Sequence, residues 1–170
     1  MLNFEKIGPE YAHLLAELCT ETFTQAYEGV HSKQNLEIYC REYYSEKAIE
    51  ESLSLDNTVA VVAFQEKEPS GFYVLKHHSC PNKLDGQASE LKQIYVMSSY
   101  YGGGLGRKLF DSSVEQSKID GSKWLWLCVS DINYQAQTFY KKLGFTQIGE
   151  GPTLFVGSDK LTSSILSLEL

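Results

Sequence analysis

The residues best suited to chemistry form a glycine cluster at residues 101–109, which read Tyr-Gly-Gly-Gly-Leu-Gly-Arg-Lys-Leu. Glycine lets the backbone adopt positive φ angles and lets an anion approach the main chain closely. Arg107 and Lys108 follow where a helix is expected to begin, so free amides, a helix dipole and two cations would converge on one anion. The cluster indicates either a phosphate cradle or a turn that only reverses the chain, and by itself it favours neither.

Two common phosphate-binding motifs do not fit this cluster. A P-loop ends in Gly-Lys followed by Ser or Thr, whereas Gly106 is followed by Arg107. A dinucleotide fingerprint that begins at Gly102 requires its third glycine at Arg107, and one that begins at Gly104 requires it at Leu109. The sequence therefore excludes both motifs here.

The cluster instead resembles the signature Q/R-x-x-G-x-G/A of the GNAT acetyltransferase superfamily. Residues 101–106 occupy its six places, with Tyr101 where the family usually has Gln or Arg. This departure affects one side-chain contact near the pyrophosphate and leaves the amide cradle intact. The preceding run, Leu91 to Met97, resembles the fourth strand of the family.

A second match lies downstream, where the strand-like run 124–129 is followed by residues 133–145, Asn-x-x-Ala-x-x-Phe-Tyr-Lys-Lys-Leu-Gly-Phe. This segment resembles the second cofactor motif of the same family. Its apolar residues also recur at helical spacing, as a buried helix face ended by Gly144 would. The presence of both motifs in order favours the acetyltransferase interpretation.

Across its whole length the chain is similar to the PaiA type of bacterial spermidine/spermine N-acetyltransferases. The similarity includes Glu21-Thr22-Phe23, Asn35, Tyr39 and Phe155-x-Gly157-x-Asp159. It implies an enzyme that moves an acetyl group from acetyl-CoA to a primary amine, with a polyamine as the favoured acceptor. Peptide amino termini and other small amines are alternative acceptors. A non-catalytic module that binds coenzyme A as a sensor or partner is the alternative from another class.

The resemblance also implies which residues form the site. Tyr140 corresponds to the tyrosine that protonates the departing thiolate, although the spacing alone would favour a packing role. Val96 is the position for a backbone amide at the thioester carbonyl, on a strand whose bulge admits the pantetheine arm. Asn133 offers an amide to that arm and equally suits an N-cap. The implied cofactor-binding residues are Ile94, Tyr95, Val96, Met97, Gly102, Gly103, Gly104, Leu105, Gly106, Arg107, Lys108, Asn133, Tyr140 and Lys142.

Glu90 is the candidate general base, because related enzymes often place a carboxylate just before this strand. It would take the proton of the amine directly or through water. A glutamate that merely faces solvent is the alternative. His77 and His78 are adjacent, so on a strand they would point to opposite faces and at most one could line a site. We interpret both as edge or loop residues.

The elements that position these residues follow from periodicity and turn residues. Helices are expected from Gly8-Pro9-Glu10 towards Tyr27, and over 34–43, 45–53, 104–118 and 133–143. Strands are expected over 2–7, 58–64, 72–75, 91–97, 123–129, 145–148, 154–156 and 165–168, with a turn at 68–71 and a surface loop at 77–87. Residues 1–170 are thus expected to form a single domain of the α/β (α+β) class. The order of these elements predicts a mixed central sheet with helices on both faces. The resemblance implies that this sheet is largely antiparallel, in the GNAT-like fold.

Composition narrows the functional classes. The chain has 170 residues, of which 42% are hydrophobic and 22% charged, which is typical of one globular unit. Its net charge of −7 disfavours nucleic acid and anionic membranes as partners and suits a cationic one. The start lacks a signal-peptide pattern and no window is long enough to span a membrane, so a cytoplasmic location is expected. A homodimer is left open.

Two further expectations concern cysteines and acidic residues. The four cysteines, Cys19, Cys40, Cys80 and Cys128, are widely spaced without a CxxC pair, so we expect reduced thiols, no disulfide and no metal site. Between His31 and Ala60, carboxylates outnumber cations and would attract a cationic acceptor towards aromatic faces. Solubility explains the same carboxylates equally well. The residues in question are Glu37, Glu42, Glu46, Glu50, Glu51 and Asp56, with the rings of Tyr27, Tyr39, Tyr43 and Tyr44.

Overall fold

A computed structural model describes residues 1–81 and 83–170; Asn82, which falls within the loop expected at 77–87, lies outside the described residues. The strands are β1 (Leu2–Ile7), β2 (Thr58–Gln65), β3 (Glu68–Lys76), β4 (Ala88–Val96), β5 (Trp124–Ser130), β6 (Thr146–Glu150), β7 (Leu154–Val156), β8 (Asp159–Leu161) and β9 (Ser163–Glu169). The helices are α1 (Ala12–Tyr27), α2 (Lys33–Tyr43), α3 (Glu46–Leu53), α4 (Leu105–Ile119) and α5 (Tyr134–Lys142), with 3-10 turns at Pro9–Tyr11 and Ser98–Tyr100.

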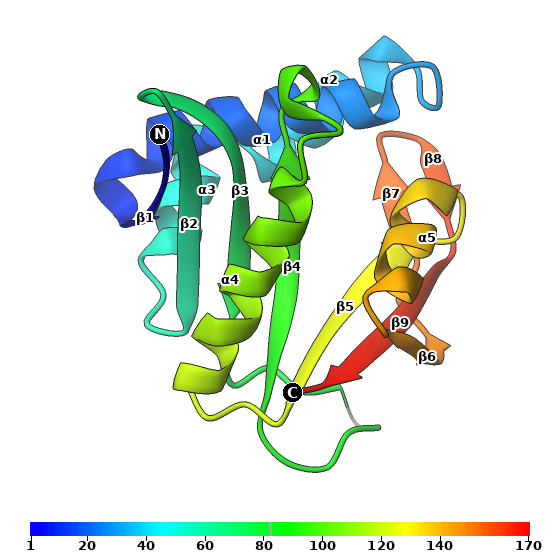
Figure 1. Ribbon diagram of the computed structural model, residues 1–170. Helices are drawn as coiled ribbons and strands as arrows, with labels where there is room; N and C mark the ends of the chain where they lie inside the picture. Colours follow the sequence, from blue (N-terminus) through cyan, green and yellow to red (C-terminus); the bar gives the residue numbers. More distant parts are fainter. Residues whose placement is uncertain (82) are drawn as a thin grey trace.

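Seven strands form one sheet in the order β1-β2-β3-β4-β5-β9-β6, and β7 and β8 form a separate hairpin (Figure 1). Within the seven-stranded sheet, β4 and β5 pair in parallel, and the other neighbours pair in an antiparallel manner. The expected mixed, largely antiparallel sheet is therefore confirmed.

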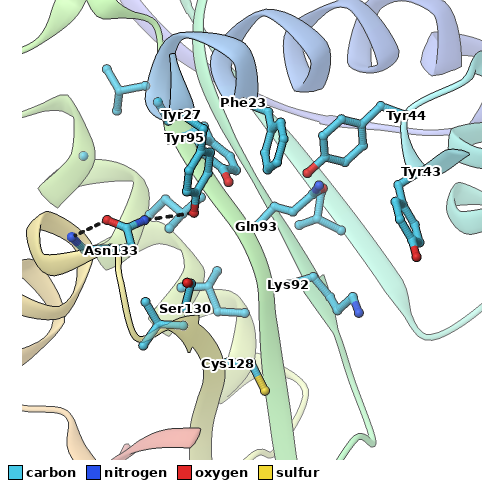
Figure 2. A pocket seen from close by; sticks show the side chains of 18 of the residues that line it. Phe23, Tyr27, Tyr43, Tyr44, Lys92, Gln93, Tyr95, Cys128, Ser130 and Asn133 are labelled. Carbon is cyan, nitrogen blue, oxygen red and sulfur yellow. Dashed lines mark hydrogen bonds between the residues drawn. The ribbon is translucent and has the colours of Figure 1, made fainter. Parts of the chain in front are cut away.

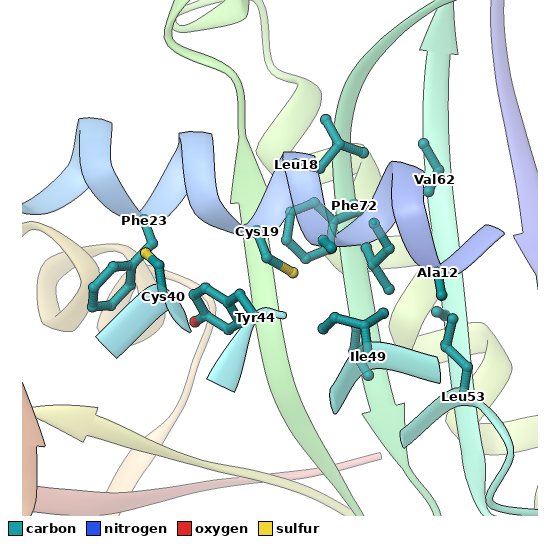
Figure 3. Close-up of a cluster of buried hydrophobic side chains, with 14 of the residues drawn as sticks. Ala12, Leu18, Cys19, Phe23, Cys40, Tyr44, Ile49, Leu53, Val62 and Phe72 are labelled. Carbon is teal, nitrogen blue, oxygen red and sulfur yellow. The ribbon is translucent and has the colours of Figure 1, made fainter. Parts of the chain in front are cut away.

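Helices cover both faces of this sheet, also as expected. Alternate residues of β2 point to opposite faces: Ala60 and Val62 pack under α1, α2 and α3, whereas Val59 and Val61 pack under α4. Figure 3 shows the first of these clusters, in which Phe72 from β3 meets the α1 and α3 side chains. Full burial of one such side chain contributes about 1.5–3 kcal/mol, so the two clusters hold the helices on the sheet.

A gap opens between the two parallel strands at the centre of the sheet. The ladder between β4 and β5 ends at the pair Glu90 and Trp126, after which β5 continues along β9 alone. Figure 1 shows β5 diverging from β4 beyond this point. The pairing of β3 with β4 skips one residue, Lys92, which is a β-bulge in β4. Because β5 no longer pairs with β4 beyond Glu90, the remainder of β4 has a free edge towards the gap.

Two local expectations are wrong. The turn between β2 and β3 lies at Glu66 and Lys67, which both have positive φ as a two-residue hairpin turn requires, and not at residues 68–71. Pro69 is tolerated inside β3 because the register there shifts at a bulge. His77 is not a surface residue: it is only 5% exposed and its ring contacts Ser89.

The helix starts agree with their sequence signals. The hydroxyl of Ser45 accepts a hydrogen bond of 3.3 Å from the amide of Ala48, which caps α3 at the start of the helix expected over 45–53. Ser32 caps α2 in the same way, through the amide of Asn35 at 3.2 Å. Among the described residues, no helix combines the length and the apolar character needed to cross a membrane.

Candidate active site

A cavity of about 1100 Å³ runs through the gap between β4 and β5. At one end it is lined by the glycine cluster at the start of α4, and at the other by aromatic side chains of α1 and α2. Figure 2 shows the middle of this cavity, where Tyr95 and Gln93 of β4 face the rings of Tyr27 and Tyr44. The cavity therefore joins the two regions that the sequence analysis singled out.

The glycine cluster forms an open concavity in front of α4. Gly102 and Gly104 have positive φ angles of 79° and 76°, and a Cβ atom at either position would meet no atom within 4 Å. Gly104 is also the residue that precedes the helix. Within the described part of the chain, no group accepts a hydrogen bond from the backbone amides of residues 102–107. An anion can thus reach several free amides and the positive end of the helix dipole at once.

The free edge of β4 offers a second set of amides. The amide of Met97 donates to the carbonyl oxygen of Ser70 on β3 at 2.9 Å. Because successive amides of a strand point to alternate edges, the amides of Val96 and Ile94 face the gap. Both residues line the cavity. An extended, amide-containing chain could therefore pair with β4 in place of a strand.

Two side chains of the helix that follows β5 reach the cavity. Tyr140 of α5 lines it, and burial, with a smaller contribution from Tyr27, raises the pKa of its phenol well above the usual value. Asn133 caps α5 through the amide of Ala136 at 3.0 Å and donates to the hydroxyl of Tyr27, also at 3.0 Å. The cap role predicted for Asn133 is confirmed. At neutral pH the Tyr140 phenol therefore carries its proton and can donate a hydrogen bond.

The end of the cavity that α1 and α2 line is an aromatic enclosure. Phe23 stacks on Tyr39 with ring centroids 4.3 Å apart, and Tyr44 meets Phe23 edge-on at 5.6 Å. Burial raises the pKa of Tyr39 to about 12, and it raises the pKa values of Tyr27, Tyr44 and Tyr95 as well. These phenols stay neutral, so they offer ring faces and hydroxyl groups but no negative charge.

Charged side chains also line the cavity, and one of them, Glu90, lies where the β4–β5 ladder ends. Glu90 is 14% exposed, and its carboxylate lies 3.7 Å from the ammonium of Lys92 and accepts from Ser79 Oγ at 3.4 Å. Lys76, Arg107 and the thiol of Cys128 also line the cavity. Burial, followed by the charge of Glu90, raises the pKa of Cys128, so this thiol is neutral. The six carboxylates expected to attract the acceptor are exposed on and after α2 and α3, outside the lining.

The structure brings most of the sequence-predicted site residues together. Those that line the cavity are Glu90, Ile94, Tyr95, Val96, Gly102, Gly104, Leu105, Gly106, Arg107, Asn133 and Tyr140. The remaining four predicted residues do not line the cavity. Two of them, Gly103 and Lys108, are exposed beside it, and Lys142 is exposed at the end of α5. The fourth, Met97, donates its amide to Ser70 of β3. Tyr101, the departure from the signature, lines the cavity and is 56% exposed.

Some lining residues were not predicted as site residues. Gln93 and Lys92 lie at the bulge of β4 and both line the cavity, and a single sequence does not reveal a bulge. Cys128 and Ser130 come from the diverging part of β5. Phe155 of the β7–β8 hairpin belongs to the motif Phe155-x-Gly157-x-Asp159. It reaches the cavity because the folded chain brings distant segments together, which the motif does not reveal.

Comparisons with known proteins agree with this geometry. The model of the acetyltransferase (GNAT) family matches residues 16–145. A spermidine N(1)-acetyltransferase of Thermoplasma acidophilum is 26% identical over 85% of this chain and 88% of that protein. An uncharacterized N-acetyltransferase in the pepI 3' region of Lactobacillus delbrueckii subsp. lactis is 24% identical over 98% of this chain and 94% of its own length.

A solved structure shares the whole architecture. The PaiA N-acetyltransferase of Thermoplasma acidophilum, crystallised in complex with coenzyme A, superposes with a TM-score of 0.82 at 21% identity, covering 100% of this chain and 99% of that chain. Because the superposition covers 100% of this chain, it includes the seven-stranded sheet. Since the family model spans both the glycine cluster and the Tyr140 helix, the chain belongs to the acetyltransferase (GNAT) family.

Proposed function

We propose that this protein transfers an acetyl group from acetyl-CoA to a primary amine. The observation that carries this proposal is the continuity of one cavity from the open glycine concavity, past the free edge of β4 and Tyr140, to the aromatic enclosure. A cofactor with an anionic end and an extended amide arm fits the first two parts. An acceptor molecule fits the third.

The residues that would hold acetyl-CoA follow from the geometry. The amides of residues 102–107, with the Arg107 side chain nearby, would bind the pyrophosphate. The amides of Ile94 and Val96 would pair with the pantetheine arm and polarise the thioester carbonyl. Acetyl-CoA supplies an acyl group that an amine can attack. The phenol of Tyr140 holds a proton at the cavity, where it would protonate the sulfur as the thiolate leaves.

Removal of the proton from the amine is assigned to Glu90. This residue lies six positions before Val96 on the same strand, which is about 20 Å along an extended chain. That separation is too long for Glu90 to contact an amine that attacks at Val96, so the proton would travel through water within the cavity. Ile94, whose amide also faces the gap, lies two residues nearer to Glu90 than Val96 does.

A polyamine is the proposed acceptor. The support comes from the relative named spermidine N(1)-acetyltransferase and from the aromatic faces of the enclosure, which suit ammonium groups. Glu90 is the carboxylate among the described lining residues, and it would attract one such group. The protein as a whole carries a net charge of −7, which raises the local concentration of a polycation.

The direct experiment measures release of free thiol from acetyl-CoA in the presence of purified protein and an amine panel. The panel contains spermidine, spermine, a peptide with a free amino terminus and a neutral amine. Amine-dependent thiol release with spermidine preferred would support the proposal in full. Release with another amine would retain acetyl transfer and overturn the polyamine. Tight binding of coenzyme A without release for any amine would favour the non-catalytic sensor module.

A further inference from the structure

The β7–β8 hairpin forms one wall of the acceptor enclosure although it is not part of the seven-stranded sheet. Thr153, Leu154 and Phe155 line the cavity, and the Phe155 ring is 54% exposed. Val156 and Leu161 of the hairpin also line the cavity, and both pack against the cluster that contains the enclosure ring Phe23. An isolated two-stranded hairpin is marginally stable in water, so contacts elsewhere must fix this wall.

The tip of the hairpin is attached to the segment that joins α1 to α2. His31 Nδ1 lies 2.7 Å from the carboxylate of Asp159, and the His31 side chain is only 2% exposed. One step away, Asn35 Oδ1 accepts from the backbone amide of Ser158 at 3.2 Å, and Asn35 Nδ2 donates to Ser158 Oγ at 3.3 Å. These contacts join residues that are 128 and 123 positions apart in the sequence.

The backbone at the tip lies directly against the first turn of α2. Gly157 has a positive φ of 56°, and a Cβ atom there would lie 2.8 Å from the Cα atom of Asn35. The hydrogen bond from His31, followed by that from Asn35, lowers the pKa of Asp159, so the carboxylate is charged at neutral pH. A charged acceptor paired with a buried ring nitrogen forms one of the stronger kinds of hydrogen bond. Figure 1 shows β7 and β8 beside the connection between α1 and α2.

We propose that His31, Asn35 and Asp159 form a clasp that fixes the β7–β8 hairpin as a wall of the acceptor site, which makes them positioning residues for the amine. The inference rests on the proposed acetyl transfer to an amine. At its base the hairpin is held by the amide of Gly151 on the carbonyl of Ser163, at 2.8 Å, and this contact does not restrain the tip. Without the clasp, the hairpin would be held by this contact and by the packing of Val156 and Leu161, so Phe155 would be positioned less firmly.

The kinetic test compares Asp159→Ala with Asp159→Asn and with a surface control, Asp85→Ala, which removes an exposed carboxylate that contacts Lys123. The alanine variant should raise the KM for the amine about tenfold, the factor that corresponds to the lower end of a charged hydrogen bond. Both kcat and the KM for acetyl-CoA should stay within about twofold of their original values. The change removes a contribution to amine binding that is equal in the ground state and in the transition state. The asparagine variant, whose amide oxygen accepts from His31, should restore a KM near that of the unaltered protein.

The second readout needs no turnover. Amide hydrogen exchange of residues 154–161 should accelerate in Asp159→Ala and in Asn35→Ala, while exchange in α4 and β2 stays unchanged and the protein remains folded. Unaltered exchange at the hairpin would overturn the clasp. Accelerated exchange together with an unchanged KM for an accepted amine would overturn its role in acceptor binding. If no amine is acetylated, the proposed function fails while the exchange data still decide whether the clasp exists.

Discussion

Asn133 donates a hydrogen bond of 3.0 Å from its side-chain amide to the phenol oxygen of Tyr27, and this contact joins the start of α5 to the end of α1 across the cavity (Figure 2). The oxygen of the same side chain caps α5 through Ala136. The helix that bears Tyr140 is thereby linked to α1, which carries part of the aromatic enclosure, so one side chain connects the proposed thioester site to the proposed acceptor site.

A first prediction concerns the glycine concavity. Gly104→Asn should weaken acetyl-CoA binding, because the added side chain occupies the space in front of the free amides. The affinity should fall by about tenfold or more, which is the effect of losing one charged hydrogen bond. Gly104→Val or Gly106→Val should have the same direction. Isothermal titration calorimetry measures the effect.

Gly29→Asn is the matched control for this change. Both glycines have positive φ angles, 80° at Gly29 and 76° at Gly104, and neither would place a Cβ within 4 Å of another atom. Asparagine tolerates the left-handed region, so the backbone cost of the two variants is similar. Equal affinities for acetyl-CoA in both folded variants would remove the cradle from the mechanism.

A second prediction concerns the acid. Tyr140→Phe removes one hydroxyl, so kcat should fall about 10²-fold while the affinity for acetyl-CoA is kept. Since the pKa of Tyr140 is raised, its phenol keeps its proton as the pH rises, and the unaltered enzyme should show no loss of kcat from this group up to about pH 10. Pre-steady-state thiol release across pH provides the measurement. Normal turnover of the variant would assign sulfur protonation to water or another group.

Much of this architecture was predictable from local signals. The alternation of Val59, Ala60, Val61 and Val62 indicates a strand buried on both faces, and the serine cap of α3 fixes where that helix begins. The turn at Glu66 and Lys67 was missed because neither residue is a turn former, while Pro69 and Gly71 nearby are. The position of this turn is set by the pairing register of β2 and β3 and not by the turn propensity of the residues nearby.

The candidate site was predictable where it depends on motifs and not where it depends on long-range pairing. The glycine cluster and Tyr140 each carry a sequence pattern. The gap exists because the β4–β5 ladder ends at Glu90 and Trp126, and nothing local to either strand specifies that end. The contact of Asn35 with Ser158 likewise requires the folded chain to bring α2 to the hairpin.

A third prediction separates two roles of Glu90. Glu90→Gln keeps the size of the side chain, and loss of a proton acceptor should lower kcat about 10²-fold at neutral pH. The deficit should shrink as the pH approaches about 10, where a primary amine loses its proton unaided. Lys92→Met is the control that removes the neighbouring cation. A higher KM for spermidine with an unchanged kcat would show instead that Glu90 binds a second ammonium group.

A fourth prediction concerns ionic strength. The KM for spermidine should rise several-fold between about 0.05 M and 0.5 M salt, because screening shortens the range of attraction between a polycation and this acidic protein. The KM for acetyl-CoA, an anion that approaches Arg107, should respond differently. Steady-state kinetics at constant pH test both. A KM for spermidine that ignores salt, or a preference for a neutral or acidic amine, would argue against the polyamine and leave acetyl transfer unaffected.

The last prediction follows from the buried ring of His77. Its Nδ1 atom lies 2.7 Å from Ser89 Oγ and 3.2 Å from the carboxylate of Asp120, while its Nε2 atom is buried without a partner in the described part of the chain. Burial lowers the pKa of His77; the Asp120 carboxylate acts in the opposite direction, and the charges of His78 and Lys6 lower it further. The folded protein therefore holds this ring in its neutral form below the pKa of about 6.5 that the unfolded chain would show.

Below that pH the unfolded chain binds a proton that the folded chain does not, so the free energy of unfolding should fall as the pH drops from about 7.5 to 5.5. The contribution of one such proton is at most about 1.4 kcal/mol per pH unit. His77→Gln should flatten this slope, whereas His13→Gln, a change at an exposed histidine, should retain it. Urea unfolding of the three proteins at both pH values measures the slopes. If His77→Gln loses stability on acidification as steeply as the unaltered protein, the buried ring is not the group that titrates.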